Sequence, residues 1–133
     1  MKKIGFIGLG NMGTKMTINL LKANYEVIGY DINENLVNKL LPNGIHKASN
    51  LNEITDDIDV IITMLPNGEI VERVYENIID KLKPDTLLTD CSTIDVKTAK
   101  DLHEMCDDKS LLSLDAPVSG GVGGAEKGKL TFI

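Results

Sequence analysis

Residues 3–13 read KIGFIGLGNMG, a short apolar run followed by three closely spaced glycines. The first five of these residues predict a β-strand. Apolar side chains spaced by four residues come next, at Met12, Met16 and Leu20, and they predict a helix over 11–23. A GxGxxG segment alone is weak evidence, because glycines are common. Between a strand and a helix, however, it has the context in which such loops bind the pyrophosphate of a dinucleotide.

Each glycine of this loop has a separate task in such a site. Gly8 permits the tight turn, Gly10 lets the pyrophosphate approach the backbone, and Gly13 lets the helix pack closely on the strand. The start of the helix adds free N–H groups and a partial positive charge. A turn without a ligand is the simpler alternative. The predicted cofactor-binding residues of the loop are Gly8, Leu9, Gly10, Asn11, Met12 and Gly13.

Short apolar runs alternate with amphipathic stretches along the rest of the chain. Further strands are predicted over 26–30, 59–65, 85–90 and 111–115, with helices over 68–80 and from the Ser92 cap to about 107. KLTFI (129–133) predicts a sixth strand. This alternation indicates an α/β fold, a doubly wound parallel sheet with helices on both faces. Length indicates one domain, 1–133.

Two helix starts are marked by capping residues. Asn33 is expected to cap a helix whose inward face is Leu36, Val37, Leu40 and Leu41, and the PNG segment (42–44) ends that helix. Ser92 and Asp95 have the spacing of a capping box, which predicts that Ser92 caps the helix that runs to about 107.

Asp31 directly follows the second predicted strand, eighteen residues beyond Gly13. A dinucleotide site places an acidic residue there, against the ribose hydroxyls. A carboxylate at this place should repel the extra phosphate of NADP, and no Arg stands beside it. The sequence therefore favours NAD over NADP; a solvated loop aspartate is the alternative.

The unusual residues recur at one edge of the predicted sheet. The glycine-rich loop, Asp31, the MLP segment (64–66), Cys91–Thr93 and Pro117–Gly121 each follow the carboxyl end of a predicted strand. Ligands of open α/β sheets bind along that edge. Taken singly, Pro66 is also expected at a strand end, and Ser92 or Thr93 is equally well explained as a helix cap.

Composition excludes several other classes of protein. The net charge of −6 argues against a nucleic-acid partner. No apolar run approaches the length of a membrane span, and the first strand leaves no room for a targeting peptide, so a cytoplasmic protein is expected. Two cysteines predict free thiols. His46 and His103 are isolated, and TDDID (55–59) predicts a solvated acidic turn rather than a metal site.

Several motifs together resemble the β-hydroxyacid dehydrogenase family, and the 3-hydroxyisobutyrate dehydrogenases most closely. They span nearly the whole chain in the expected order: IGFIGLGNMG, YD at 30–31, MLP, DCSTID at 90–95 and DAPVSGGVGGAEKGKLTF. The last motif is specific to the family, whereas the first indicates only a dinucleotide.

The resemblance implies an NAD-linked oxidoreductase for a small 3-hydroxy acid, with a Rossmann-type cofactor domain and a homo-oligomeric full-length enzyme. It implies that Leu65, Pro66 and Thr93 line the nicotinamide side of the cofactor, and Met64 is a further predicted cofactor-binding residue. Ser119, Gly120 and Gly121 match the substrate-anchoring segment. A hydroxyl and backbone N–H groups near a helix start at Val122 suit a carboxylate, and Gly128 would end that short helix.

The resemblance also implies parts that these 133 residues do not contain. Family members continue with further strands and a helical domain, whose first long helix carries the catalytic lysine in a GxxGxGxxxK context. Lys127 and Lys129 do not match that motif. The domain is therefore expected to be incomplete at its C-terminal end, with no catalytic residue in this chain and the lysine beyond Ile133.

Alternatives remain within and outside the family. Sibling enzymes reduce glyoxylate, succinic semialdehyde or tartronate semialdehyde, or oxidise 6-phosphogluconate. A stand-alone NAD-binding module without catalysis is a second possibility, although such a module has no use for Ser119–Gly121. A methyltransferase would leave MLP and that segment unexplained.

Overall fold

Six parallel strands form the main sheet of the computed structural model, which describes residues 2–132. Their order is β3-β2-β1-β4-β5-β6, so β1 lies between β2 and β4. The strands are β1 (Lys3–Ile7), β2 (Glu26–Tyr30), β3 (His46–Lys47), β4 (Val60–Thr63), β5 (Leu87–Asp90) and β6 (Leu112–Asp115). The predicted doubly wound α/β fold is confirmed. The strand order reverses beside β1, where such sheets open a ligand crevice at their carboxyl edge.

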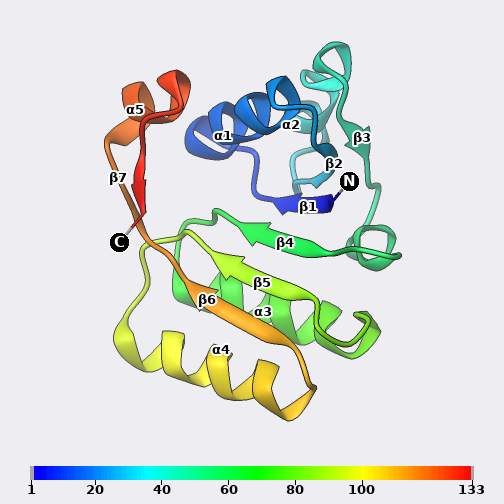
Figure 1. The fold of residues 1–133 in the computed structure, drawn as a ribbon, viewed down its shortest axis with the longest axis vertical. Helices are drawn as coiled ribbons and strands as arrows, with labels where there is room; N and C mark the ends of the chain where they lie inside the picture. Colours follow the sequence, from blue (N-terminus) through cyan, green and yellow to red (C-terminus); the bar gives the residue numbers. More distant parts are fainter. Residues whose placement is uncertain (1, 133) are drawn as a thin grey trace.

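Helices cover both faces of this sheet, as Figure 1 shows. Helices α1 (Asn11–Lys22) and α2 (Glu34–Asn38) lie on one side. Helices α3 (Gly68–Ile78) and α4 (Val96–Asp108) lie on the other. Two apolar clusters fill the spaces between, one around Phe6 and Val27 and the other around Ile61 and Leu88, all four fully buried. Burial on both faces explains why the central strands are continuous apolar runs.

Short 3₁₀ turns and one short strand complete the connections. The turns span Leu41–Asn43, Leu51–Thr55 and Ile79–Lys81. Asn33 does cap α2, since its side chain accepts a hydrogen bond from the Asn35 N–H. The predicted helix was too long, however: α2 ends at Asn38, and Leu41 is about half exposed. Pro42 cannot continue a helical hydrogen-bond ladder, so the chain tightens before it.

The predicted role of Ser92 as a helix cap is wrong. Helix α4 begins at Val96, and the Asp95 carboxylate caps it by accepting from the Thr98 N–H at 3.1 Å. The Ser92 side chain is fully buried and accepts a hydrogen bond from the Leu65 N–H instead. Ser92 and Asp95 both have side chains that can cap this helix. Because the Ser92 hydroxyl accepts from the Leu65 N–H, which follows β4, Asp95 caps the helix instead.

The described part of KLTFI, residues 129–132, does not join the main sheet, contrary to expectation, and Ile133 lies outside the described residues. Thr131–Phe132 forms β8, which pairs antiparallel with β7 (Val118–Ser119) in a separate two-stranded sheet. Between them, α5 (Gly121–Lys127) ends at Gly128 in the left-handed region, with φ of 68°. The turn at Gly128 reverses the chain, so that β8 returns alongside β7. The sixth strand of the main sheet is β3, which forms one edge. The other edge is β6, whose Leu112 and Leu114 are about half exposed.

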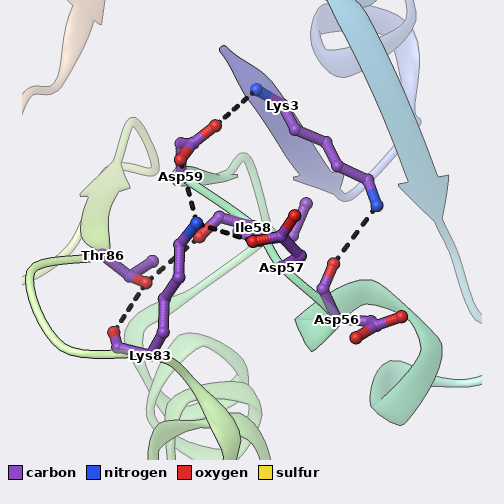
Figure 2. A network of polar contacts seen from close by, with 7 residues as sticks. All are labelled: Lys3, Asp56, Asp57, Ile58, Asp59, Lys83 and Thr86. Carbon is purple, nitrogen blue, oxygen red and sulfur yellow. Dashed lines mark hydrogen bonds and ion pairs between the residues drawn. The ribbon is translucent and has the colours of Figure 1, made fainter.

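The acidic turn at 55–59 lies at the amino ends of the parallel strands, opposite the carboxyl ends that face the expected ligand crevice. There it forms the polar network of Figure 2. Lys83 Nζ contacts Asp57 Oδ1 at 2.9 Å and Asp59 Oδ1 at 3.1 Å, while Asp59 Oδ2 accepts from the Lys3 N–H at 2.8 Å. The Lys3 N–H and then Lys83 hold the pKa of Asp59 below its usual value. Within residues 2–132 no group of three or more His, Cys, Asp or Glu side chains is arranged to hold a metal ion. The network therefore ties strand ends together.

Candidate functional site

The glycine-rich loop closes over the carboxyl end of β1 in a shape that only glycine permits at two positions. Gly8 has φ of 101°, and a Cβ there would lie 2.2 Å from the Met64 carbonyl oxygen. A Cβ on Gly13 would lie 1.9 Å from the Gly8 carbonyl oxygen. Both contacts are with backbone, which cannot move aside as a flexible side chain can. These two glycines therefore serve the packing of loop, helix and strand.

Gly10 differs from its neighbours because it faces open space. No atom lies within 4 Å of the position that a Cβ would take. Gly10 is the N-cap of α1, and the first helical hydrogen bond runs from Thr14 N to the Gly10 carbonyl. The N–H groups of the first helical turn, 11–13, precede that bond and have no acceptor within the helix. An open approach to free N–H groups fits the pyrophosphate of a dinucleotide.

The side chains of the loop are divided between core and surface. Leu9 is fully buried, and its N–H donates to Asp31. Its carbonyl accepts from the Thr14 hydroxyl at 2.7 Å. Asn11 is exposed and Met12 is half-buried. Leu9 is thus a structural member of the loop, and its side chain is not available to a ligand.

The Asp31 carboxylate joins the end of β2 to this loop. Its Oδ2 accepts from the Leu9 N–H at 2.7 Å, and its Oδ1 accepts from the Asn33 N–H at 2.8 Å. Each carboxylate oxygen has a second lone pair. Both oxygens thus retain the capacity to accept from a hydroxyl, and the residue is half-buried rather than sealed off.

Backbone hydrogen bonds connect the successive loops along the carboxyl edge. Met64 N donates to the Ile7 carbonyl at 3.0 Å, and Cys91 N donates to the Thr63 carbonyl at 2.9 Å. Met64 and Leu65 are half-buried, whereas Pro66 and Thr93 are exposed. The predicted nicotinamide-side residues therefore follow adjacent strands next to the glycine-rich loop.

Asp90, the last residue of β5, is the buried acidic residue of this edge. Its side chain is 2 % exposed, and Oδ1 accepts from the Thr63 hydroxyl at 2.7 Å and from the Ser92 N–H at 3.2 Å. Burial raises the pKa of Asp90 above its ordinary value, although the Ser92 and Thr63 bonds oppose this. Burial also raises the pKa of the neighbouring Cys91 thiol to about 12, so Cys91 is no thiolate nucleophile at neutral pH.

The predicted substrate segment is placed by α5 rather than by the sheet. Ser119, Gly120 and Gly121 are exposed, and within residues 2–132 no hydrogen bond joins them to the loops after β1, β2, β4 or β5. Helix α5 packs on α1, where Asn19 Nδ2 donates to the Ala125 carbonyl at 2.5 Å. In Figure 1, β7 and α5 lie on the side toward which β4 and β5 point. The segment therefore borders the carboxyl edge.

Sequence interpretation gave no role to Asp90 or Asn19 and took Ser92 for a helix cap, although all three organise this edge. An acidic residue closing a buried apolar strand was an available signal for Asp90, because such a residue needs hydrogen-bond partners. Asn19 gave no signal, since it occupies an ordinary helical position.

None of the helices within residues 2–132 combines the length and apolar character that crossing a membrane needs.

Comparisons with known proteins agree with this geometry. Residues 3–133 match the family described as the NAD binding domain of 6-phosphogluconate dehydrogenase. A probable mitochondrial 3-hydroxyisobutyrate dehydrogenase of Dictyostelium discoideum is 44% identical over 135 residues, which is 99% of this chain and 42% of that protein.

Solved structures show the same similarity in three dimensions. The Mycobacterium tuberculosis 3-hydroxyisobutyrate dehydrogenase, solved with L-serine, has a TM-score of 0.96 and 41% identity, over 99% of this chain and 45% of that one. Psf3, solved in complex with NADP⁺ and 2-OPP, has a TM-score of 0.92 and 28% identity, over 97% of this chain and 47% of that one.

The chain spans less than half the length of each of these relatives. The family match nevertheless covers nearly every residue, and the strand order and glycine-rich loop are those that a dinucleotide-binding domain requires. The chain belongs to the NAD-binding domain family of the 3-hydroxyisobutyrate and 6-phosphogluconate dehydrogenases.

Proposed function

We propose that this chain is the cofactor-binding and substrate-anchoring part of an NAD-dependent 3-hydroxyacid dehydrogenase. The observation that carries the proposal is the meeting of Asp31 with the glycine-rich loop, through the Leu9 N–H, beside an unobstructed Gly10. This contact supports a site in which the Asp31 carboxylate accepts from ribose hydroxyls and the free N–H groups of α1 bind a pyrophosphate.

The preference for NAD rests on the charge of Asp31. NADP carries a phosphate on the ribose oxygen that faces this residue, and the carboxylate would repel it. The residue that follows is Ile32, which is exposed and offers no positive charge. Psf3 was solved with NADP⁺, so the cofactor preference of this chain needs its own measurement.

The chain's own groups divide the work of binding. The Gly8–Gly13 loop takes the pyrophosphate and Asp31 takes the adenosine ribose. The loop at 64–66 and Thr93 border the nicotinamide, which accepts a hydride when the cofactor is bound. The Ser119 hydroxyl and the N–H groups after it bind the substrate carboxylate.

The substrate class is a small 3-hydroxy acid. The Dictyostelium relative is named for 3-hydroxyisobutyrate, and the Mycobacterium enzyme was solved with L-serine. Both compounds carry a carboxylate and a hydroxyl on the third carbon. Oxidation also needs a group that accepts the hydroxyl proton. By the family resemblance that group is a lysine in a GxxGxGxxxK context, which residues 1–133 do not contain.

Replacing Asp31 with asparagine should weaken NAD binding and remove the discrimination against NADP. Asparagine keeps one oxygen to accept from the Leu9 N–H but has no charge. We expect the ratio of NADP to NAD dissociation constants to fall by about tenfold, roughly 1.4 kcal/mol. Isothermal titration calorimetry with both cofactors measures this. The matched control is Glu34→Gln, an exposed acidic residue three positions away; an unchanged ratio in Asp31→Asn would refute the assigned role.

The reaction is tested in a chimera. Residues 1–133 are joined to the part of the Dictyostelium relative that follows its matching segment. We expect absorbance of NADH at 340 nm to rise with 3-hydroxyisobutyrate or L-serine as substrate, and to stay flat when the relative's catalytic lysine is replaced by alanine. A chimera that binds NAD yet oxidises neither acid would contradict the proposed activity.

A further inference from the structure

Asp90 and Ser92 belong to a buried chain of hydrogen bonds between the carboxyl ends of β4 and β5, and this chain is called the relay below. Ser92 is 0 % exposed and Asp90 is 2 % exposed. The Leu65 N–H donates to Ser92 Oγ at 2.8 Å, and the Thr63 hydroxyl donates to Asp90 Oδ1 at 2.7 Å. The Ser92 N–H in turn donates to Asp90 Oδ1 at 3.2 Å. These bonds link the loop at 64–66, which is predicted to border the cofactor, to the buried Asp90 side chain, which the cofactor would not touch.

The two hydrogen bonds of Ser92 connect Asp90 to the backbone of Leu65. A serine hydroxyl has one proton and two lone pairs. The Ser92 oxygen accepts from the Leu65 N–H at 2.8 Å, and the Ser92 N–H donates to Asp90 Oδ1 at 3.2 Å. Asp90 thereby holds the backbone of Ser92, and the Ser92 hydroxyl holds the backbone of Leu65.

Strand pairing does not require this arrangement. The backbone bond from Cys91 N to the Thr63 carbonyl already joins the two strand ends at 2.9 Å. Burying a carboxyl group costs free energy, and Asp90 Oδ2 has no hydrogen-bond partner among the described residues. Buried polar groups that are only partly satisfied tend to be found where function requires them.

Leu65 lies directly against the glycine-rich loop. A Cβ at Gly8 would be 2.9 Å from Leu65 Cδ2. A shift of the Leu65 backbone would therefore change the space between the loop after β1 and the loop after β4. By the proposed function, this is where the nicotinamide half of the dinucleotide lies.

We propose that Asp90 and Ser92 are positioning residues that hold Leu65 in place for the nicotinamide half of NAD. This inference rests on the proposed function and deepens it. Neither residue contacts the adenosine side, where Asp31 and the start of α1 lie. Loss of the relay should therefore affect one half of the cofactor and spare the other.

The test compares NAD with ADP-ribose, which lacks only the nicotinamide. In Ser92→Ala we expect the dissociation constant for NAD to rise by about tenfold, roughly 1.4 kcal/mol, by calorimetry. That for ADP-ribose should stay within about twofold, the scatter expected for independent sites. Ser113→Ala is the matched control, because it makes the same change on β6, where the Ser113 hydroxyl contacts His103 Nδ1 and lies outside the relay.

A double-mutant cycle tests whether the two residues act as one. Asp90→Ala should weaken NAD binding about as much as Ser92→Ala, and the double variant should lose no more than either alone. Retained binding of ADP-ribose shows that a variant is folded. If Asp90→Ala does not fold, Ser92→Ala decides the question by itself.

The outcomes separate this inference from the proposed function. An equal loss of both ligands in Ser92→Ala, or no loss of either, would overturn the positioning role. If the unchanged chain binds NAD no more tightly than ADP-ribose, the positioning role fails while dinucleotide binding stands. If it binds neither ligand, the proposed function itself fails.

Discussion

Valine in place of Gly10 should abolish NAD binding and leave the fold intact. The backbone of Gly10 has φ of −70° and ψ of −161°, an extended conformation that valine adopts. Its Cβ would meet nothing within 4 Å. The isopropyl group would instead occupy the space through which a pyrophosphate reaches the N–H groups of α1. We expect at least about a hundredfold loss of NAD affinity, roughly 2.8 kcal/mol.

Calorimetry and thermal unfolding, measured on the same sample, separate affinity from stability in this variant. The matched control is Gly123→Val in α5, where a Cβ also meets nothing within 4 Å and where no cofactor contact is proposed. The control should bind NAD as the unchanged chain does. Undiminished binding in Gly10→Val would mean that the pyrophosphate does not approach the chain at this glycine.

The fold was predictable because its signals are local. A parallel strand buried on both faces is a continuous apolar run, and a helix between two strands is an amphipathic stretch, so each element could be recognised without its neighbours. The carboxyl-edge residues followed from that alternation, since every parallel strand ends at the same side of the sheet. Gly8, Asp31 and Leu65 therefore lie on the edge where they were expected.

The errors have a common physical cause, which is that they depend on distant partners. KLTFI has strand character, but local pattern does not say which strand it pairs with; the left-handed turn at Gly128 returns it to β7. Ser92 has capping character, but its hydroxyl is taken by the Leu65 N–H, 27 residues away in sequence. Asp90 shows the same limit, because its burial depends on the Thr63 hydroxyl on the adjacent strand.

The site also shows why a glycine motif carries more than one requirement. Gly10 is needed by the proposed ligand, whereas Gly8 and Gly13 are needed by the chain itself, because a side chain at either would meet backbone atoms. The motif already predicts a separate task for each glycine, and the atoms that a Cβ would meet at each position agree with those tasks. Substitution should therefore separate them into one residue that controls affinity and two that control folding.

Alanine in place of Gly13 should destabilise the chain severely, whether or not NAD is present. Its Cβ would lie 1.9 Å from the Gly8 carbonyl oxygen and 3.2 Å from the Phe6 ring, so α1 must move away from β1. Overpacking against side chains typically costs about 1–3 kcal/mol, and backbone gives way less easily, so we expect about 3 kcal/mol or more. Domains of this size are stable by only about 5–15 kcal/mol. Urea unfolding followed by circular dichroism measures the loss.

Gly123→Ala is the matched control for that substitution. It makes the same change within helix α5, in open space and without a positive φ, where alanine should be neutral or gain up to about 1 kcal/mol. An unfolding midpoint of Gly13→Ala equal to that of the unchanged chain would mean that loop and helix can separate at no cost. The glycine spacing would then reflect the ligand alone. The expected results are a loss of affinity in Gly10→Val and a loss of stability in Gly13→Ala. Together they mean that the ligand requires Gly10, whereas the packing of α1 on β1 requires Gly13.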